Sequence, residues 1–430
     1  MKEYPYWWDT TPGFSESQIP NPEFRLPVPE HTDVAIVGAG YTGLAAARQL
    51  ARAGASVIVL ERDGVGEGAS SRNGGQVLTG LRLDASTLVS RYGETHARAL
   101  FEAASESIAT LERLVADEGI ACDLRRSGHL AAACKPAHFR AFRHEQTMLA
   151  RAFGYRVELV PRSEQRSEIG SDAYHGLLVD ENSLAVNPAK YVVGLAAAAR
   201  RAGALIAPHT SVDRVDRRGG GWTIHTSRGV LDAGDLLVAT NGYTSAAFPA
   251  LRRRFVPIGS YIVATAPLAP DVASRLLPKR RMAFDSKYFL YYFRVTDDGR
   301  LLFGGRAEFS EPTADSSRRA ARILQDGIHK VFPELSGVAI EYAWGGRAAF
   351  TRDEMPRAGV LDGAYYAGGY GGHGIALATY LGSTIGRRLG GEPIDHPLFD
   401  DRFAPIPLYR GRPWFLPMVG AYYKAKDLFT

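Results

Sequence analysis

The sequence predicts an α/β fold of two intertwined domains, one with a parallel sheet and one with a mixed, largely antiparallel sheet flanked by helices. Three observations predict it. An apolar strand runs into a glycine-rich turn and a helix at residues 33–53, and a second glycine cluster precedes a helix at residues 368–389. Strand-like runs alternate with turns from residue 255 to 350. The two glycine turns stand nearly a whole chain apart, which predicts a discontinuous first domain.

The first glycine turn carries the strongest motif. Residues 33–43 read DVAIVGAGYTG, in which Gly38 allows a tight turn, Gly40 admits a pyrophosphate and Gly43 lets the next helix pack closely. That helix, expected over residues 42–53, presents the positive end of its dipole to an anion. A second strand over residues 55–61 ends at Glu61, placed to hold a ribose hydroxyl and to disfavour a 2′-phosphate. The motif predicts a dinucleotide site of Rossmann type without separating NAD from FAD, and the alternative is a glycine-rich turn in an ordinary α/β domain.

The remaining segments follow from spacing and turn residues. Residues 64–80 form a glycine-rich loop suited to wrapping a ligand, and apolar residues at helical spacing predict helices within 85–119 and over 136–153 and 187–202. Strands are expected at 204–216, 222–227, 230–232, 235–242, 288–295, 300–305, 338–344 and 364–368, and a helix at 375–389.

This order of elements predicts the domain boundaries. Residues 1–30 form an irregular N-terminal arm, and residues 396–430 a C-terminal tail. Residues 31–85, 155–245 and 352–395 form the nucleotide domain, and residues 86–154 and 246–351 form the substrate domain.

Composition excludes several classes of protein. The 430 residues are 45% hydrophobic and 23% charged, as in a soluble globular protein. No apolar run is long enough for a membrane span and the start of the chain lacks a signal-peptide core, so we expect a cytoplasmic protein. Two cysteines cannot form a disulfide framework or an all-cysteine zinc site, and no metal is expected. The net charge of +5 is scattered, which favours solvated loop charges over a nucleic-acid patch and leaves open attraction of an anionic substrate.

Together these segments resemble the FAD-dependent amine oxidases of the D-amino acid oxidase superfamily, such as glycine and sarcosine oxidases. The resemblance rests on VGAGYTGL at residues 37–44, GAS with RNGGQ at residues 68–76, and Tyr370 with Gly372-His373-Gly374. It covers nearly the whole chain, and the pattern is closest to the γ-glutamylputrescine oxidases. It implies that the nucleotide domain binds FAD.

The resemblance also implies which residues contact FAD. They are Gly38, Gly40, Tyr41, Thr42, Gly43, Glu61, Arg62, Ala69, Ser70, Asn73, Gly74, Gly75, Gln76, Val212, Thr240, Asn241, Gly242, Gly371, Gly372, His373, Gly374 and Ile375. Relatives that bind the flavin covalently use a cysteine, expected here within residues 345–351, or a histidine beside residues 68–70. Neither is present, so we expect non-covalent FAD.

The implied reaction is oxidation of a C–N bond. A neutral amine gives a hydride to the flavin, the imine hydrolyses, and molecular oxygen reoxidises the flavin with release of hydrogen peroxide. The cofactor supplies the chemistry, so no general acid or base is expected. A dehydrogenase that passes electrons to a partner or quinone and a non-catalytic FAD-binding protein are the alternatives.

Substrate choice is expected to depend on cations that depart from the relatives' pattern. Lys287, Arg306 and Arg347 lie on predicted substrate-domain strands, and an arginine can hold a carboxylate through two parallel hydrogen bonds. They favour a small carboxylated secondary amine or N-substituted amino acid of the iminodiacetate or N-carboxymethyl type; γ-glutamylputrescine is the alternative. Each cation could instead be a solvated residue or part of a structural ion pair. Tyr291 and His373 complete the expected substrate site.

Overall fold

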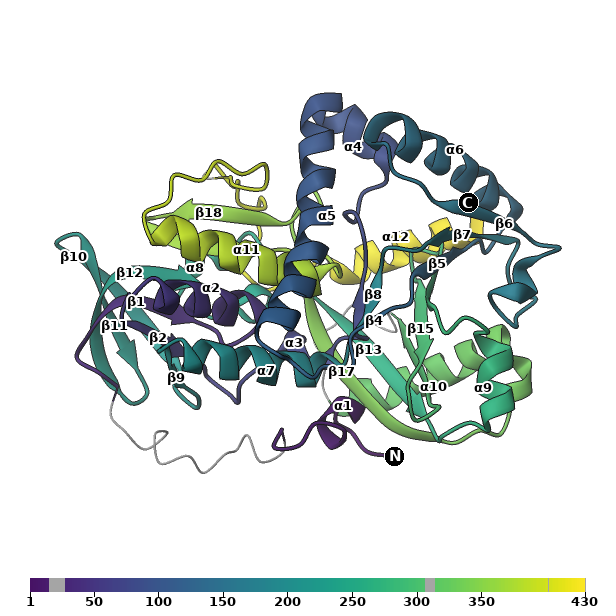
Figure 1. Ribbon diagram of the computed structural model, residues 1–430, viewed down its shortest axis with the longest axis horizontal. Coiled ribbons are helices and arrows are strands. Elements are labelled where there is room, and N and C mark those ends of the chain that lie inside the picture. The colour runs from purple at the N-terminus through teal and green to yellow at the C-terminus, as the bar shows by residue number, and fades with distance from the viewer. Residues whose placement is uncertain (15–27, 306–313, 401, 430) are drawn as a thin grey trace.

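Two eight-stranded sheets lie side by side in the computed structural model, which describes residues 1–14, 28–305, 314–400 and 402–429 (Figure 1). The first sheet has the order β10-β11-β12-β1-β2-β9, with β19 joined to β12 and β18 joined to β19. Its members are β10 (Val212–Arg218), β11 (Gly221–Thr226), β12 (Gly229–Val238), β1 (His31–Val37), β2 (Val57–Leu60), β9 (Leu205–Ala207), β18 (Arg357–Leu361) and β19 (Ala364–Gly368).

The centre of the first sheet is parallel, as the sequence predicts. β1 pairs in parallel with both β12 and β2, and Val34 to Val37 are buried because strands and helices cover them on every side. The two short runs expected at 230–232 and 235–242 form one continuous strand, β12, since the pairing with β11 and then β1 extends through Asp232 to Asp235.

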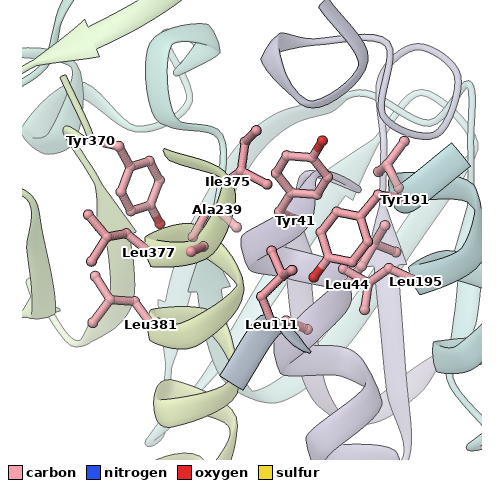
Figure 2. Close-up of a cluster of buried hydrophobic side chains, with 14 of the residues drawn as sticks. Tyr41, Leu44, Leu111, Tyr191, Leu195, Ala239, Tyr370, Ile375, Leu377 and Leu381 are labelled. Atoms are coloured by element: carbon pink, nitrogen blue, oxygen red, sulfur yellow. The ribbon is translucent and has the colours of Figure 1, made fainter. Parts of the chain in front are cut away.

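Helices α2 (Tyr41–Arg52), α7 (Pro188–Arg201), α11 (Gly374–Leu389) and α5 (Glu94–Asp117) pack on this sheet and on one another (Figure 1). α2 and α11 approach so closely that a Cβ at Gly382 would lie 2.2 Å from the carbonyl oxygen of Thr42. Leu44, Leu111 and Tyr191 fill the core between these helices (Figure 2). This packing places the first turn of α2 beside Gly382, about two turns into α11.

The second sheet has the order β17-β13-β16-β15-β14-β5-β7-β6. Its strands are β17 (Ile340–Phe350), β13 (Val256–Thr265), β16 (Leu301–Gly305), β15 (Tyr291–Val295), β14 (Met282–Asp285), β5 (His129–Ala132), β7 (Gly176–Asp180) and β6 (Glu158–Pro161). All neighbouring pairs are antiparallel except β14 with β5, which agrees with the predicted mixed sheet. β6 and β7 belong to this sheet although the predicted boundary at residue 155 assigned them to the nucleotide domain; we propose that this boundary lies after β7.

Helices α10 (Ala314–Val331), α9 (Pro270–Leu276), α6 (Pro136–Phe153) and α4 (Ala85–Tyr92) accompany the second sheet. The sequence analysis did not identify α10. Its side chains Ala320, Leu324 and Ile328 recur every fourth residue and pack against the sheet, which is the helical pattern that the reading of residues 255–350 as strands overlooked.

Short elements complete the described chain. They are α1 (Tyr6–Asp9), α3 (Ala69–Arg72), α8 (Pro249–Arg252), α12 (Leu416–Phe429), the 3₁₀ turns η2 (Gln165–Ser167), η3 (Asn241–Tyr243) and η4 (Pro333–Leu335), and a small sheet of β3 (Gln76–Val77), β8 (Leu184–Ala185) and β4 (Arg125–Arg126). Both the predicted irregular arm and the predicted tail therefore contain a helix. No helix within the described ranges has the length and apolar character needed to cross a bilayer.

Candidate active site

A cavity of about 530 Å³ lies between the two sheets. The first sheet contributes the turn after β1 and the end of β2, and α3 with β3 contributes the loop from residue 68 to 76. The turn between β19 and α11 forms another wall, and β13, β15 and β17 of the second sheet close the opposite side. One continuous site therefore joins both glycine clusters to the second sheet.

Backbone geometry shapes the nucleotide end of this cavity. Gly38 has φ +108°, and a Cβ there would lie 3.0 Å from the carbonyl oxygen of Ala239. A Cβ at Gly40 would lie 2.9 Å from Ser70 Oγ, and one at Gly43 would lie 2.0 Å from the carbonyl oxygen of Gly38. Gly38 and Gly43 require glycine because a Cβ there would meet backbone oxygens, and a Cβ at Gly40 would displace the Ser70 hydroxyl. The turn can thus pass close to a pyrophosphate while α2 stays against β1.

Glu61 holds this turn as well as facing the cavity. Its Oε2 accepts a hydrogen bond from the Ala39 N–H at 2.8 Å, and its Oε1 accepts one from the Asp63 N–H at 3.0 Å. Burial raises the pKa of this carboxyl above its usual value. The structure thus gives Glu61 a local role, bracing the glycine turn, that the sequence analysis did not foresee.

The loop from Ala69 to Gln76 is tied by its own side chains. Asn73 Nδ2 donates to the carbonyl oxygens of Ala69 at 3.0 Å and Ser70 at 2.9 Å, and its Oδ1 accepts from the Gly75 N–H at 2.9 Å. The Tyr41 hydroxyl donates to the Ser70 carbonyl at 2.5 Å. The loop therefore presents a fixed backbone to the cavity.

The second glycine turn ends in a buried histidine. Gly371 and Gly372 have φ +59° and +102°, and they bring His373 to the first turn of α11. His373 Nδ1 is buried without a hydrogen-bond partner among the described residues. Burial, with smaller contributions from Arg82 and His129, lowers the pKa of His373 to about 3, so its ring is neutral at physiological pH.

These features fit FAD. The N-termini of α2 and α11 both line the cavity and offer positive dipole ends to electron-rich groups. The glycine cradle leaves room that any Cβ would fill, and the unpartnered His373 Nδ1 is a polar atom that a bound ring system can satisfy. Within the described residues no cluster of three His, Cys, Asp or Glu could hold a metal ion.

Most of the expected FAD residues line this cavity. They are Gly38, Gly40, Tyr41, Thr42, Glu61, Arg62, Ala69, Ser70, Asn73, Gly74, Gln76, Val212, Thr240, Asn241, Gly371, Gly372, His373, Gly374 and Ile375. Gly43, Gly75 and Gly242 do not line it. Gly43 and Gly75 are needed for backbone contacts behind the wall, because a Cβ at Gly75 would lie 2.2 Å from the Val186 carbonyl oxygen.

The other end of the cavity is lined by side chains of the second sheet and the loops near it. Phe284, Leu290, Ile258 and Phe350 form apolar walls. Tyr292 lies on β15 and shares a hydrogen bond of 2.9 Å between its hydroxyl and Ser260 Oγ. We propose that this region, which residues of the second sheet help to line, is the substrate end.

Arg82 and His129 are the polar residues at this end that the sequence analysis missed. The Arg82 guanidinium lies 5.1 Å from the centre of the Phe350 ring, and its Nε donates to Glu354 Oε2 at 2.5 Å. His129 pairs through Nδ1 with Ser183 Oγ at 2.7 Å, and burial lowers its pKa. No local motif marks either residue; only the fold brings them to the cavity.

Two of the five predicted substrate residues lie off the cavity wall, which corrects those predictions. Lys287 makes an ion pair of 2.9 Å with the buried carboxylate of Asp285, and its ammonium sits 3.7 Å from the centre of the Tyr291 ring. Tyr291 packs against Phe303 and the core of the second sheet, because alternation along β15 turns Tyr292 to the cavity instead.

The other three differ. His373 lines the cavity, as described above. Arg347 also lines it, but its guanidinium lies 5.4 Å from the centre of the Tyr243 ring, beside η3. Arg306 lies outside the described residues.

Comparisons with known proteins agree with this geometry. The family model for FAD-dependent oxidoreductases of the DAO type matches residues 33–388. A probable oxidoreductase OrdL of Rhizobium meliloti is 34% identical over 429 residues, covering 97% of this chain and 98% of the relative. The γ-glutamylputrescine oxidoreductase of Escherichia coli is 33% identical over 403 residues, covering 92% of each chain.

A solved structure shares the fold. Glycine oxidase from Geobacillus kaustophilus superposes with a TM-score of 0.71 at 21% identity, covering 86% of this chain and 96% of that one. The family match, the long relatives and the two-turn cavity confirm the resemblance and the cofactor. This chain belongs to the DAO family of FAD-dependent oxidoreductases and is an oxidoreductase of the amine and amino acid oxidase type.

Proposed function

We propose that this protein oxidises the C–N bond of a small secondary amine or N-substituted amino acid that carries a carboxylate, of the iminodiacetate type. FAD, held non-covalently, supplies the hydride acceptor, and molecular oxygen is the final oxidant. The imine product hydrolyses to a carbonyl compound and a smaller amine. The cytoplasm is the proposed location.

Arg82 is the observation that carries the carboxylate preference. Its side chain is 22% exposed and lines the substrate end, close to the second glycine turn: a Cβ at Gly371 would lie 3.1 Å from Arg82 Cδ. Arg82 Nε donates its hydrogen bond to Glu354, and neither Nη1 nor Nη2 donates one within the described residues. Arg82 therefore offers two N–H-bearing nitrogens for a carboxylate, in the position that Lys287 and Arg306 were expected to fill.

The remaining side chains set the charge state of the amine. His373 is neutral, and burial lowers the pKa of His129, so neither ring adds charge beside the amine at neutral pH. The apolar walls of Phe284, Leu290 and Phe350 limit water near the reacting carbon. Such a site favours the deprotonated amine, the form whose C–H bond can donate a hydride.

A panel of amines scored by peroxide release tests this proposal. We expect iminodiacetate and N-alkyl amino acids to exceed uncharged amines in kcat/KM. Arg82→Met should raise KM for carboxylated amines about tenfold, the loss of one charge-assisted contact, and change kcat less. Arg98→Met, on the outer face of α5, is the control. Equal activity on carboxylated and uncharged amines, or an unchanged KM in Arg82→Met, would refute the carboxylate preference.

A second candidate substrate is γ-glutamylputrescine, favoured by the Escherichia coli relative at 33% identity. Its carboxylate lies far from the oxidised amine, so Arg82 would bind the remote end. If this compound gives the highest kcat/KM in the panel, the second candidate replaces the first.

The same purified protein tests the cofactor and oxidant. Acid precipitation should release all the FAD, whereas flavin left in the pellet would contradict non-covalent binding. Rapid mixing of substrate-reduced protein with oxygen should restore the oxidised spectrum. Slow recovery in air would instead favour a dehydrogenase that passes electrons to a partner.

A further inference from the structure

Three of the chain's five tryptophans donate hydrogen bonds to consecutive residues of the loop from Ala69 to Gln76, which we call the FAD-binding loop. Trp8 Nε1 lies 3.0 Å from Ser71 Oγ, Trp344 Nε1 lies 2.9 Å from the Arg72 carbonyl oxygen, and Trp7 Nε1 lies 2.8 Å from the Asn73 carbonyl oxygen. Trp7 and Trp8 belong to the N-terminal arm, hundreds of residues from β17, which carries Trp344. We propose that the arm of residues 1–14 positions the FAD-binding loop and sets how tightly FAD is retained.

The tryptophans act from behind the loop. The three tryptophans do not line the cavity, whereas these residues of the loop do: Ala69, Ser70, Arg72, Asn73, Gly74 and Gln76. The arm is thus a positioning element that never touches the substrate. Any effect on FAD must pass through the backbone or the side chains of the loop.

The arm is docked firmly enough to hold the loop. Tyr6 and Trp7 are 5% and 3% exposed, and the Tyr6 hydroxyl donates to Asp298 Oδ1 at 2.7 Å. Lys2 extends the edge of the second sheet: its N–H donates to the Glu341 carbonyl at 2.6 Å, and its carbonyl accepts from the Ala343 N–H at 2.9 Å. Figure 1 shows α1 beside β17 and the start of α7.

Two arginines join the arm to the loop. The Arg72 guanidinium lies 4.9 Å from the centre of the Trp8 ring, and that of Arg294 lies 5.7 Å from the centre of the Trp7 ring. Arg294 Nη1 donates to the carbonyl oxygens of Gly75 and Val186, each at 3.0 Å. Indole and guanidinium donors therefore hold the backbone carbonyls of Arg72, Asn73 and Gly75.

The hydrogen bonds from Trp7 and Trp344 fix the orientation of two peptide groups in the loop. Both indole donors reach backbone carbonyls, so those carbonyls point away from the cavity. If an indole is removed, its buried carbonyl loses its partner and can seek another by rotating the peptide, which would spoil the surface that FAD meets. Loop order and FAD binding are thus linked: FAD binds a loop that the arm has already ordered.

Titration of FAD-free protein with FAD, followed by the quenching of flavin fluorescence, tests the proposal without using activity. Trp7→Phe keeps an aromatic ring and removes the N–H donor. We expect Trp7→Phe and Trp8→Phe each to raise the Kd for FAD about tenfold, and the double variant more. Trp222→Phe on β11 is the matched control, because Trp222 is 9% exposed and lies away from the cavity. Trp414→Phe, which is 60% exposed, is the second.

A double-mutant cycle separates positioning from general stability. Trp8→Phe and Ser71→Ala remove the two partners of one hydrogen bond, so their effects on the Kd for FAD should be strongly non-additive. Thermal unfolding should show that the gain in Tm on adding FAD shrinks in the arm variants and is retained in Trp222→Phe.

Two results would overturn the proposal. One is a Kd for FAD in both Trp7→Phe and Trp8→Phe within twofold of the Trp222→Phe value. The other is an additive cycle between Trp8 and Ser71. Trp8 is only half-buried, so Trp8→Phe should fold even if Trp7→Phe does not, and the test remains decisive.

Discussion

The two ends of the cavity are built by different means. At the nucleotide end the chain shapes the site with backbone: Gly38 and Gly43 leave no room for a Cβ, and Glu61 binds the turn itself. At the substrate end the site is made of side chains such as Arg82, Tyr292 and Phe350, which come from segments far apart in the sequence. A backbone site leaves a local motif, whereas a side-chain site does not.

This difference determines which substitutions each end of the cavity can tolerate. The nucleotide end binds groups common to every FAD enzyme, so its geometry tolerates little change. The substrate end can alter its chemistry by replacing single side chains on a rigid sheet. Substitutions should therefore affect cofactor retention at one end and substrate choice at the other.

Gly43→Ala should have the largest effect. The new Cβ would meet the Gly38 carbonyl oxygen at 2.0 Å, and both groups belong to backbone, so α2 or the glycine turn must move. We expect a loss of about 3 kcal/mol in the free energy of unfolding and little bound FAD after gel filtration. Urea unfolding and the flavin absorbance per protein measure both quantities. Gly390→Ala, where the nearest atom is 3.3 Å away, is the control; equal behaviour of the two variants would show that the turn can adapt.

His373 should make stability depend on pH. The pKa of His373 in the folded protein is about 3, below the ordinary value near 6.5. Between these two pH values His373 binds a proton in the unfolded chain but stays neutral in the folded protein. Stability is then complete above pH 6.5 and falls as the pH drops toward 3, by about 2 kcal/mol at pH 5. In His373→Asn the difference in unfolding free energy between pH 8 and pH 5 should shrink by that amount. His96 is exposed, so the control variant His96→Gln should show the same difference in unfolding free energy as the unmodified protein. If this difference does not shrink in His373→Asn, the His373 ring is not buried and neutral in the folded protein.

Lys287→Met should have the smallest effect and sharpens the distinction between a binding and a structural cation. Removing Lys287 leaves the Asp285 carboxylate buried without its ion pair, and burial already raises the pKa of Asp285 to about 6. We expect a loss of about 1–2 kcal/mol in unfolding free energy, moderated by the partial exposure of Lys287. KM for every amine should stay within about twofold, since the residue is off the cavity wall. A selective rise in KM for carboxylated amines would return Lys287 to the substrate site.

Local patterns predicted most elements around the nucleotide end, but the single strand expected at 204–216 is two strands, β9 and β10, at opposite edges of the first sheet. The glycine turns, the strands beside them and helices α2, α7 and α11 follow from spacing within short segments, and the structure places them within a few residues of expectation. The sequence analysis missed α10 and did not foresee that β6 and β7 pair with the second sheet, because the partner of a strand is a property of the sheet. Tyr291 and Tyr292 show the limit most clearly: alternation along β15 says that they face opposite ways, but not which one faces the cavity.

By itself the sequence determined the family and the cofactor, and it predicted the backbone positions of the glycine turns that line the cavity. Those depend on residues close together in the chain, where glycine spacing and apolar runs have direct physical consequences. Only the tertiary structure decided that Arg82 rather than Lys287 lines the cavity, and that the arm tryptophans reach the FAD-binding loop. Such contacts join segments from different parts of the chain, and the distance between two side chains is fixed only when both sheets have formed.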